Sequence, residues 1–368
     1  MNYDFDRIID RRGTCAVKYD GISSRFGCDH AIPLWVADMD FAVCPEILEA
    51  LHHRLEHPVL GYPETPDSYW QSITGWLQRR HGLEIRREEI TFVPGVVRGI
   101  ALAVNYFTRE NDGIVIQPPV YHPFRQVIEG NRRTVIENPL ILDDDTLHYR
   151  MDLDGLENIL SERQPKMLIL CNPHNPGGIQ WDYNTLRRLA ELCRQHHVTV
   201  VSDEIHGDLM LRGGRHLPFA TVSDDAAAVA ITLGAPSKTF NIPGMVSSWY
   251  FIKNPKLRTP FYNWLQANEF DSPTMMATIA TKAAYNHGEA WLDALLDYIQ
   301  GNIDMVEEFF ASRLPEIRPM RPDASFLVWL DCRRLGFSQP ELVDRFLHKA
   351  GLALNQALIH NSAPPGPD

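Results

Sequence analysis

The sequence predicts an α/β fold in which helices cover both faces of a mostly parallel, seven-stranded sheet, with a second, smaller α+β domain. Continuous apolar runs rich in β-branched residues indicate strands that are buried on both faces. Segments with apolar residues every three or four positions lie between these runs and indicate helices. Residues 45–285 would form the large domain, and residues 1–44 with 286–368 the small one. The predicted strands are Ile90–Val93, Gly113–Gln117, Thr134–Asn138, Met167–Cys171, Val198–Ser202, Ala228–Leu233 and Ser247–Ile252.

Helix signals surround these strands. Pro45 suits a first helical position and predicts a helix to about His57, and Asp67 or Ser68 would cap the next. Two more apolar stripes indicate helices. One follows a capping Asp152 and consists of Leu153, Leu156, Ile159 and Leu160, and the other consists of Leu186, Leu189, Ala190 and Cys193. The remaining predicted elements are helices at Asp67–His81, Thr274–Asn286, Glu289–Leu314 and Gln339–Ala350, and a strand at Ser325–Leu330.

Composition argues against several classes of protein. The 368 residues are 44% hydrophobic and 22% charged, as in ordinary soluble globular proteins. A formal net charge of −12, with no basic run, argues against a nucleic-acid surface. The apolar runs are too short to span a membrane, and the acidic N-terminus is unlike a signal peptide. Six cysteines without paired spacing predict free thiols in a cytoplasmic protein rather than disulfides or a zinc site.

A single lysine, Lys238, lies in a turn of small residues that reads A-P-S-K-T-F. A lysine among small and apolar groups is poorly solvated, which lowers its pKa and leaves part of it as the nucleophilic amine that a Schiff base needs. A solvated surface lysine is the structural alternative. The other functional alternative is a phosphate-binding P-loop, but that motif requires glycine where this chain has Ser237 and Thr232.

Three more predicted strands end in residues that suit a binding site. Gly95 leads into a helix whose free backbone amides can bind a phosphate. Tyr121 or His122 can stack on a flat heterocycle. Asn172 and Asn175, in a loop stiffened by proline and glycine, can donate hydrogen bonds from fixed positions. Each residue also has an ordinary role in turns or packing, so the prediction depends on their combination.

Asp203 follows the predicted strand Val198–Ser202, within the segment D-E-I-H-G-D. A carboxylate at the end of a buried strand is unfavourable unless it faces a cation. Asp203, Glu204, His206 and Asp208 also suggest a metal site. Strand alternation, however, directs Asp203 and Glu204 to opposite faces, and no second cluster of ligands is evident, so we predict no metal.

Two segments that precede the sheet also combine aromatic and polar residues. Ile32–Phe41 interleaves two acids with aromatic and aliphatic side chains. This pattern predicts either the lip of a pocket or a strand that crosses between domains. Gly61–Pro63 is predicted to be a loop that exposes Tyr62.

The order of these features along the chain resembles that of one family. A phosphate-binding turn, an aromatic residue, an asparagine, an aspartate and a lysine each follow a separate strand. This order is similar to that of fold-type I pyridoxal-phosphate (PLP) enzymes of the aminotransferase class I/II superfamily, and of its cystathionine β-lyase-type C–S lyase branch in particular. The resemblance runs from about residue 2 to residue 355. Its motifs are W-V-A-D-M-D-F, P-P-V-Y-H-P-F, C-N-P-H-N-P-G-G, S-D-E-I-H-G-D and A-P-S-K-T-F-N-I-P-G.

The resemblance implies a role for each site residue. Lys238 would bond covalently to PLP and later remove the substrate Cα proton. Asp203 would pair with the pyridine nitrogen, so that the ring can accept electrons. Asn175 would donate to the ring hydroxyl, and Tyr121 would stack on the ring. His206 would contact the ring where many aminotransferases have a tyrosine.

The resemblance also implies how the phosphate is held and how subunits assemble. The backbone amides of Gly95, Val96 and Val97, with the hydroxyl of Ser237, would bind the phosphate. Tyr62 is similar to a tyrosine that reaches into the phosphate site of the neighbouring subunit. The predicted assembly is therefore a homodimer with shared active sites.

Two positions depart from the aminotransferase pattern. Many aminotransferases place a phosphate-binding arginine eight residues after the lysine, whereas this chain has Val246, as the C–S lyase branch implies. Family members also carry an arginine for the substrate α-carboxylate beyond the L-A-L-N segment, but no arginine follows Arg345 here. We interpret the chain after about residue 356 as truncated or altered.

The predicted function is a PLP-dependent β-lyase that cleaves cystathionine or cysteine S-conjugates to a thiol, pyruvate and ammonia. An aminotransferase that uses the same PLP site is one alternative. A non-catalytic regulatory or binding protein that keeps the PLP fold is another, which the missing arginine favours. The predicted partners are a small amino-acid substrate and a second copy of the chain, with no nucleic acid and no membrane.

Overall fold

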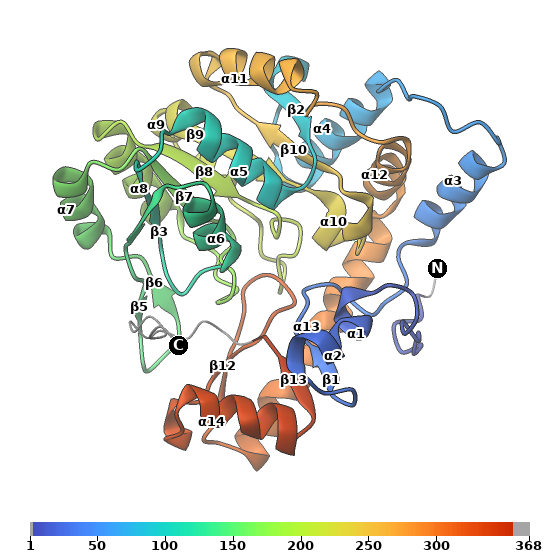
Figure 1. Cartoon of the computed structure of the whole chain (residues 1–368), viewed down its shortest axis with the longest axis vertical. Coiled ribbons are helices and arrows are strands. Elements are labelled where there is room, and N and C mark those ends of the chain that lie inside the picture. Colours follow the sequence, from blue (N-terminus) through green and yellow to red (C-terminus); the bar gives the residue numbers. More distant parts are fainter. Residues whose placement is uncertain (1–2, 356–368) are drawn as a thin grey trace.

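The computed structural model describes residues 3–355 and confirms the α/β prediction (Figure 1). A central seven-stranded sheet has the strand order β2-β10-β9-β8-β7-β3-β4. β10 is antiparallel to both of its neighbours, and the remaining pairs are parallel. The strands are β2 (Ile90–Val93), β3 (Gly113–Ile116), β4 (Thr134–Glu137), β7 (Met167–Cys171), β8 (Thr199–Asp203), β9 (Ala230–Gly234) and β10 (Ser248–Phe251).

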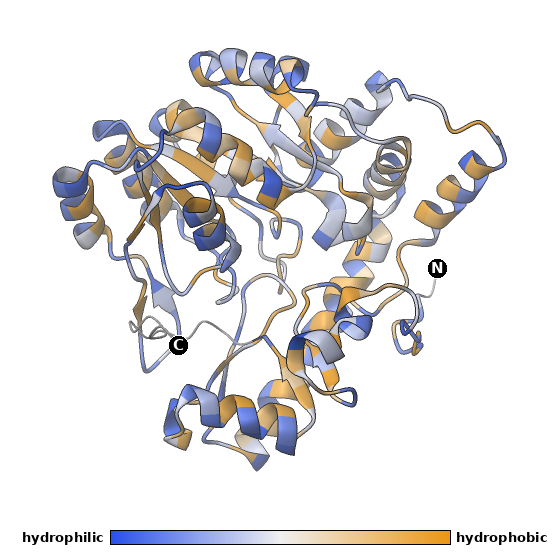
Figure 2. Cartoon of the chain, in the orientation of Figure 1, coloured by the Kyte–Doolittle hydropathy of each residue, from blue (hydrophilic) through white to orange (hydrophobic). Residues whose placement is uncertain are grey.

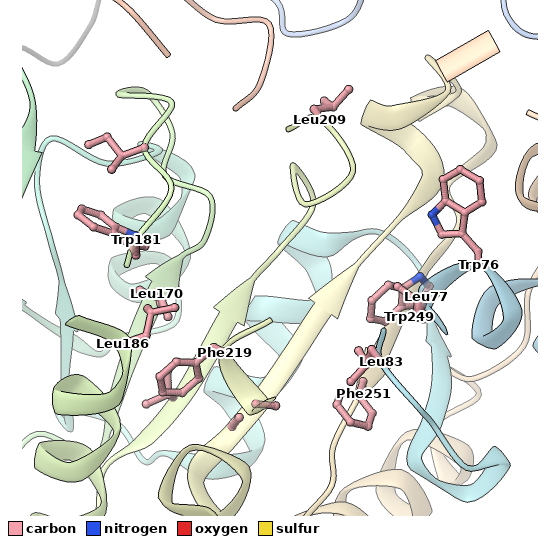
Figure 3. Close-up of a cluster of buried hydrophobic side chains, with 14 of the residues drawn as sticks. Trp76, Leu77, Leu83, Leu170, Trp181, Leu186, Leu209, Phe219, Trp249 and Phe251 are labelled. Carbon is pink, nitrogen blue, oxygen red and sulfur yellow. The ribbon is translucent and has the colours of Figure 1, made fainter. Parts of the chain in front are cut away.

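The hydrophobic core has two halves because side chains alternate between the two faces of the sheet. On β7, Met167 and Ile169 pack in one half, and Leu168 and Leu170 pack in the other (Figure 3 shows part of the second half). The first half includes residues of α5 (Val96–Phe107), α6 (Pro123–Gly130) and α11 (Pro255–Ala267). The second includes residues of α4 (Asp67–His81), α7 (Leu153–Arg163), α8 (Tyr183–Gln195), α9 (Asp224–Val229), α12 (Met275–His287) and α13 (Glu289–Arg313).

Hydropathy follows this layering. The central strands are coloured mainly as hydrophobic, whereas the surrounding helices alternate between hydrophobic and hydrophilic positions (Figure 2). Such alternation is typical of helices that cover a core with one face and meet water with the other. Within residues 3–355, no helix is both long enough and apolar enough to span a membrane.

The N-terminal segment joins the C-terminal part of the chain. β1 (Ile32–Leu34) pairs in parallel with β13 (Leu352–Leu354), and β11 (Arg318–Met320) pairs with β12 (Trp329–Asp331). The division into residues 45–285 and 1–44 with 286–368 stays a prediction. The remaining elements are α1 (Val17–Asp20), α2 (Ile22–Phe26), α3 (Pro45–Leu55), α10 (Pro236–Thr239), α14 (Gln339–Asp344) and the hairpin of β5 (Ile141–Leu142) and β6 (Tyr149–Arg150).

Several predicted boundaries were wrong. β9 starts at Ala230, not Ala228, because the preceding residues belong to α9, which extends to Val229. Ser223 caps the start of this helix, accepting a hydrogen bond from the Ala226 amide at 3.1 Å. α11 lies between the last predicted strand and the first predicted C-terminal helix and was not predicted. The predicted strand at 325–330 is reduced to β12, and Ser325 instead has a positive φ of 79°. The last predicted helix, Gln339–Ala350, is α-helical only as far as Asp344, the end of α14. Residues Arg345–Lys349 form a π-helical turn.

We expect Gly99→Ala to destabilise the protein, because α5 packs directly on the sheet at this residue. A Cβ atom there would lie 2.6 Å from Leu233 Cδ2 and 3.3 Å from Val93 Cγ2. Gly301→Ala is the matched control, since Gly301 lies within α13 and a Cβ there would meet open space. Both substitutions gain helix propensity. Denaturant unfolding should show a loss of about 1–3 kcal/mol for Gly99→Ala and a gain of about 0.5–1 kcal/mol for Gly301→Ala. Equal effects would contradict tight packing at Gly99.

Candidate active site

Three neighbouring parallel strands bring polar residues to one edge of the sheet. Cys171 at the end of β7 pairs with Asp203 at the end of β8, which pairs in turn with Leu233 of β9. The chain then turns into α10, which carries Lys238. Carboxyl ends of parallel strands are the usual place for ligand sites in such sheets. The structure therefore brings Asp203 and Lys238 to the same edge.

Lys238 is partly buried, and its amine donates a hydrogen bond to the carbonyl oxygen of Ala37. Burial lowers the pKa of Lys238, while the nearby carboxylates of Asp38 and Asp203 oppose this shift. A lowered pKa increases the fraction of free amine, which is the form that acts as a nucleophile or base. The contact with Ala37 shows that the predicted lip segment, residues 32–41, lies at this site.

Asp203 is a buried acid that forms no salt bridge with a residue in the described part of the chain. It is 4% exposed, and its Oδ1 accepts a hydrogen bond from the Ile205 amide at 3.1 Å. Burial raises the pKa of Asp203 to about 7, although the charge of Lys238 opposes the shift. The arrangement is suited to a ligand that carries a positive charge.

Tyr121 and His206 line the same region. Burial, followed by the charge of Asp203, raises the pKa of Tyr121 to about 12. Burial and the neighbouring Lys238 lower the pKa of His206 to about 3, so its ring is neutral. His206 Nδ1 has no hydrogen-bond partner among residues 3–355, which leaves a buried polar atom available to a ligand.

The two candidate asparagines differ in their contacts. The Asn172 side chain donates to the Leu217 carbonyl at 3.0 Å, and its backbone amide donates to the Asp203 carbonyl at 2.9 Å. Asn175 is partly exposed, and its backbone amide lies 3.2 Å from Cys171 Sγ. Because the Asn172 side chain is engaged in holding the loop, Asn175 is the better candidate to contact a ligand.

The candidate phosphate site lies where α5 begins. Gly95 precedes α5 with a φ of 105°, a conformation that favours glycine. A Cβ at Gly95 would lie 3.9 Å from Val246 Cγ1, which places the start of α5, with Val96 and Val97, against the loop that follows Lys238. Ser237 lies in α10, directly before the lysine. The N-terminus of α5 is the group here that attracts anions.

Tyr62 is not part of this cluster within one chain. Its side chain is fully exposed in the loop between α3 and α4. The altered chain end predicted after about residue 356 lies outside the described residues.

Two acids of the metal site considered above, Glu204 and Asp208, contact different histidines. Glu204 contacts His216 at 2.8 Å, and Asp208 contacts His81 at 2.7 Å. In the part of the chain that the structure describes, no group of three or more histidine, cysteine, aspartate or glutamate residues could hold a metal ion.

Comparison with known proteins identifies the family. Residues 29–361 match the model of the family "Aminotransferase class I and II". The chain belongs to this family. It is 45% identical to cystathionine beta-lyase PatB of Bacillus subtilis (strain 168), a match that covers 95% of this chain and 90% of PatB.

Solved structures of relatives share the fold. A PLP-bound putative aminotransferase from Clostridium difficile 630 superposes with a TM-score of 0.94 at 37% identity, covering 97% of this chain and 92% of that one. A PLP-bound C–S lyase from Staphylococcus hominis gives a TM-score of 0.89 at 31% identity, covering 98% and 92%. The family is PLP-dependent, as the sequence predicted.

The residues of the site fit PLP. The buried carboxyl of Asp203 suits a cationic ring nitrogen, and the amine of Lys238 suits an aldehyde. The unpartnered Nδ1 of His206 and the start of α5 provide further polar groups for the ring and the phosphate.

We expect Asp203→Asn to stabilise the cofactor-free protein in a pH-dependent way. The folded-state pKa of about 7 lies above the ordinary value of 3.8, so wild-type stability falls as pH rises from about 4 to 7. At its steepest this fall is about 1.4 kcal/mol per pH unit. Urea unfolding should therefore show a gain for Asp203→Asn that grows up to about pH 7 and then levels off.

The matched control is Asp145→Asn, because Asp145 is exposed. Its effect on the free energy of unfolding should not vary over the same pH range. A pH-independent effect of Asp203→Asn would contradict the raised pKa.

Proposed function

We propose that this protein is a PLP-dependent C–S β-lyase that cleaves cystathionine or cysteine S-conjugates to a thiol, pyruvate and ammonia. The observation that carries the proposal is the 45% identity to cystathionine beta-lyase PatB over 95% of the chain. Val246, in place of the arginine of many aminotransferases, also supports the lyase branch. The free cysteines support a cytoplasmic location.

The residues of the site supply proton transfer and charge stabilisation. When bound, PLP provides an electron sink for the charge that develops at the substrate Cα. Lys238 takes the Cα proton at Nζ, and the Ala37 carbonyl orients this amine. Asp203 would favour a proton on the ring nitrogen of bound PLP through its negative charge. The β C–S bond then breaks, the thiol leaves with a proton, and water replaces the amine to give pyruvate and ammonia.

The remaining residues would hold the cofactor. Tyr121 would stack on the ring, Asn175 would donate to the ring hydroxyl, and His206, whose pKa is lowered in part by the charge of Lys238, would contact the ring. The helix N-terminus and a hydroxyl would hold the phosphate. The residues in this second group are Gly95, Val96, Val97 and Ser237.

A homodimer with shared sites is part of the proposal. The connection between α3 and α4 extends away from the sheet and carries an apolar stretch (Figures 1 and 2). Val59, Leu60 and Tyr62 in this connection, and Leu55 at the end of α3, are each more than half exposed. An exposed run of large apolar side chains is typical of an interface. We infer that a second copy of the chain covers this loop, with Tyr62 entering its phosphate site.

Analysis of the reaction products tests the proposed lyase activity. With cystathionine and PLP but no keto acid, we expect pyruvate and thiol in equal amounts. Lys238→Ala should reduce this rate by about a thousandfold or more, since it removes the base. Lys253→Ala, at an exposed lysine, is the control and should retain full activity.

Other outcomes would support the alternatives. Strict dependence on a keto-acid acceptor would indicate an aminotransferase, the function suggested for the Clostridium difficile neighbour. A protein that binds PLP but whose absorption spectrum does not change with cystathionine would indicate the non-catalytic alternative.

Mixing two inactive variants tests the shared site. Tyr62→Ala and Lys238→Ala subunits, unfolded and refolded together, should form mixed dimers with one intact site each. Random pairing then restores about a quarter of wild-type activity. Sedimentation of each variant alone controls for loss of the dimer. If Tyr62 acts within its own subunit, the mixture stays as inactive as its components.

A further inference from the structure

Two buried histidine–carboxylate pairs lie next to the candidate active site. His216 Nε2 lies 2.8 Å from Glu204 Oε2, and His81 Nε2 lies 2.7 Å from Asp208 Oδ1. All four side chains are at most 9% exposed. The two imidazole rings meet edge to face with centroids 5.4 Å apart, so the pairs form one continuous cluster. The proposed reaction uses none of these four residues.

Asp208 is the link between this cluster and the lysine. Its Oδ1 also accepts a hydrogen bond from Trp76 Nε1, and its Oδ2 accepts one from Thr239 Oγ1, both at 2.9 Å (Figure 3 shows Trp76). Burial alone would raise the pKa of Asp208, but donation from His81, Trp76 and Thr239 outweighs it and lowers the pKa. Asp208 is therefore ionised, and Thr239, which directly follows Lys238, is tied to a fixed carboxylate.

Glu204 and Asp208 lie at the two ends of one turn, and Glu204 is also held by hydrogen bonds. Glu204 Oε1 accepts hydrogen bonds from Ser202 Oγ at 2.8 Å and from the Phe219 amide at 2.9 Å. Glu204 directly follows Asp203, and the turn to Asp208 includes His206. A buried carboxylate thus holds each end of the turn that carries His206, and the turn begins directly after Asp203.

We propose that Asp208, together with His81 and Thr239, is a positioning unit that sets where Lys238 lies relative to Asp203. The inference rests on the proposed function, because it takes PLP as the cofactor. PLP must reach both residues at once, so a displaced lysine turn weakens its binding. Hydrogen bonds to a buried carboxylate between packed elements are strong enough to fix this distance.

Thr239→Val tests the unit, because it removes the hydroxyl while keeping the shape of the side chain. Thr232→Val is the matched control. Thr232 is equally buried, but its hydroxyl has no hydrogen-bond partner among residues 3–355. Titration of cofactor-free protein with PLP should give a dissociation constant about tenfold higher for Thr239→Val and unchanged for Thr232→Val. Thr239→Ser, which restores the hydroxyl, should return the constant to within about twofold of wild type.

A double-mutant cycle tests whether His81 acts through the same carboxylate. His81→Phe keeps an aromatic ring beside His216 but removes the donor to Asp208. If both residues act through Asp208, the double variant His81→Phe/Thr239→Val should bind PLP about as weakly as the weaker single variant. The pH midpoint of the absorption band of the bound cofactor, which reports on Lys238, should shift in both single variants. Loss of fold stability alone would not shift it.

The outcomes separate the inference from the proposed function. Equal PLP affinity for Thr239→Val and Thr232→Val, with wild type binding normally, would overturn the positioning unit and leave the proposed function standing. Failure of Thr239→Ser to restore affinity, or additive effects in the cycle, would also overturn it. A wild-type protein that takes up no PLP would overturn both.

Discussion

The register of three neighbouring parallel strands is the constraint on which the candidate site depends. Cys171, Asp203 and Leu233 lie side by side because β7, β8 and β9 pair in this register. The strands are buried on both faces, so a slip by one residue would move apolar side chains from one half of the core to the other. The hydrophobic core therefore determines where Asp203 emerges, and the asparagine loop and the lysine turn begin just beyond it.

The buried position of Asp203 lowers the stability of the folded protein but favours binding of a positively charged ligand. An ionised carboxyl in a buried position is unfavourable until a cation lies beside it, and Lys238 meets this need only in part. The low local dielectric that raises the pKa of Asp203 also strengthens its attraction to a positively charged ring. The same burial thus destabilises the cofactor-free protein and would strengthen the proposed cofactor site.

Local sequence patterns predict the strands and the residues at their ends. A strand buried on both faces leaves a continuous apolar run, and a charged residue soon after it, such as Asp203 or Lys238, is conspicuous. Contacts between distant segments leave no such pattern. Ala37 acts through a backbone carbonyl 201 residues from Lys238, so its side chain carries no signal. His81 and Asp208 are 127 residues apart, and each resembles an ordinary residue at the end of a helix or in a loop.

The segment that carries Ala37 is itself fixed by hydrogen bonds to other parts of the chain. Arg11 donates to both oxygens of the Asp38 carboxylate, at 3.0 and 2.7 Å. A partly buried ion pair adds little net stability, because desolvation offsets much of the attraction, but its two parallel hydrogen bonds define an orientation. Asn241 bonds the backbone of Met39 on the same segment, with distances of 2.9 Å. Asn241 follows Lys238 closely in the chain, so one short stretch both carries the amine and holds the segment whose carbonyl orients it. The amine is therefore oriented in the cofactor-free protein, before any contact with a cofactor forms.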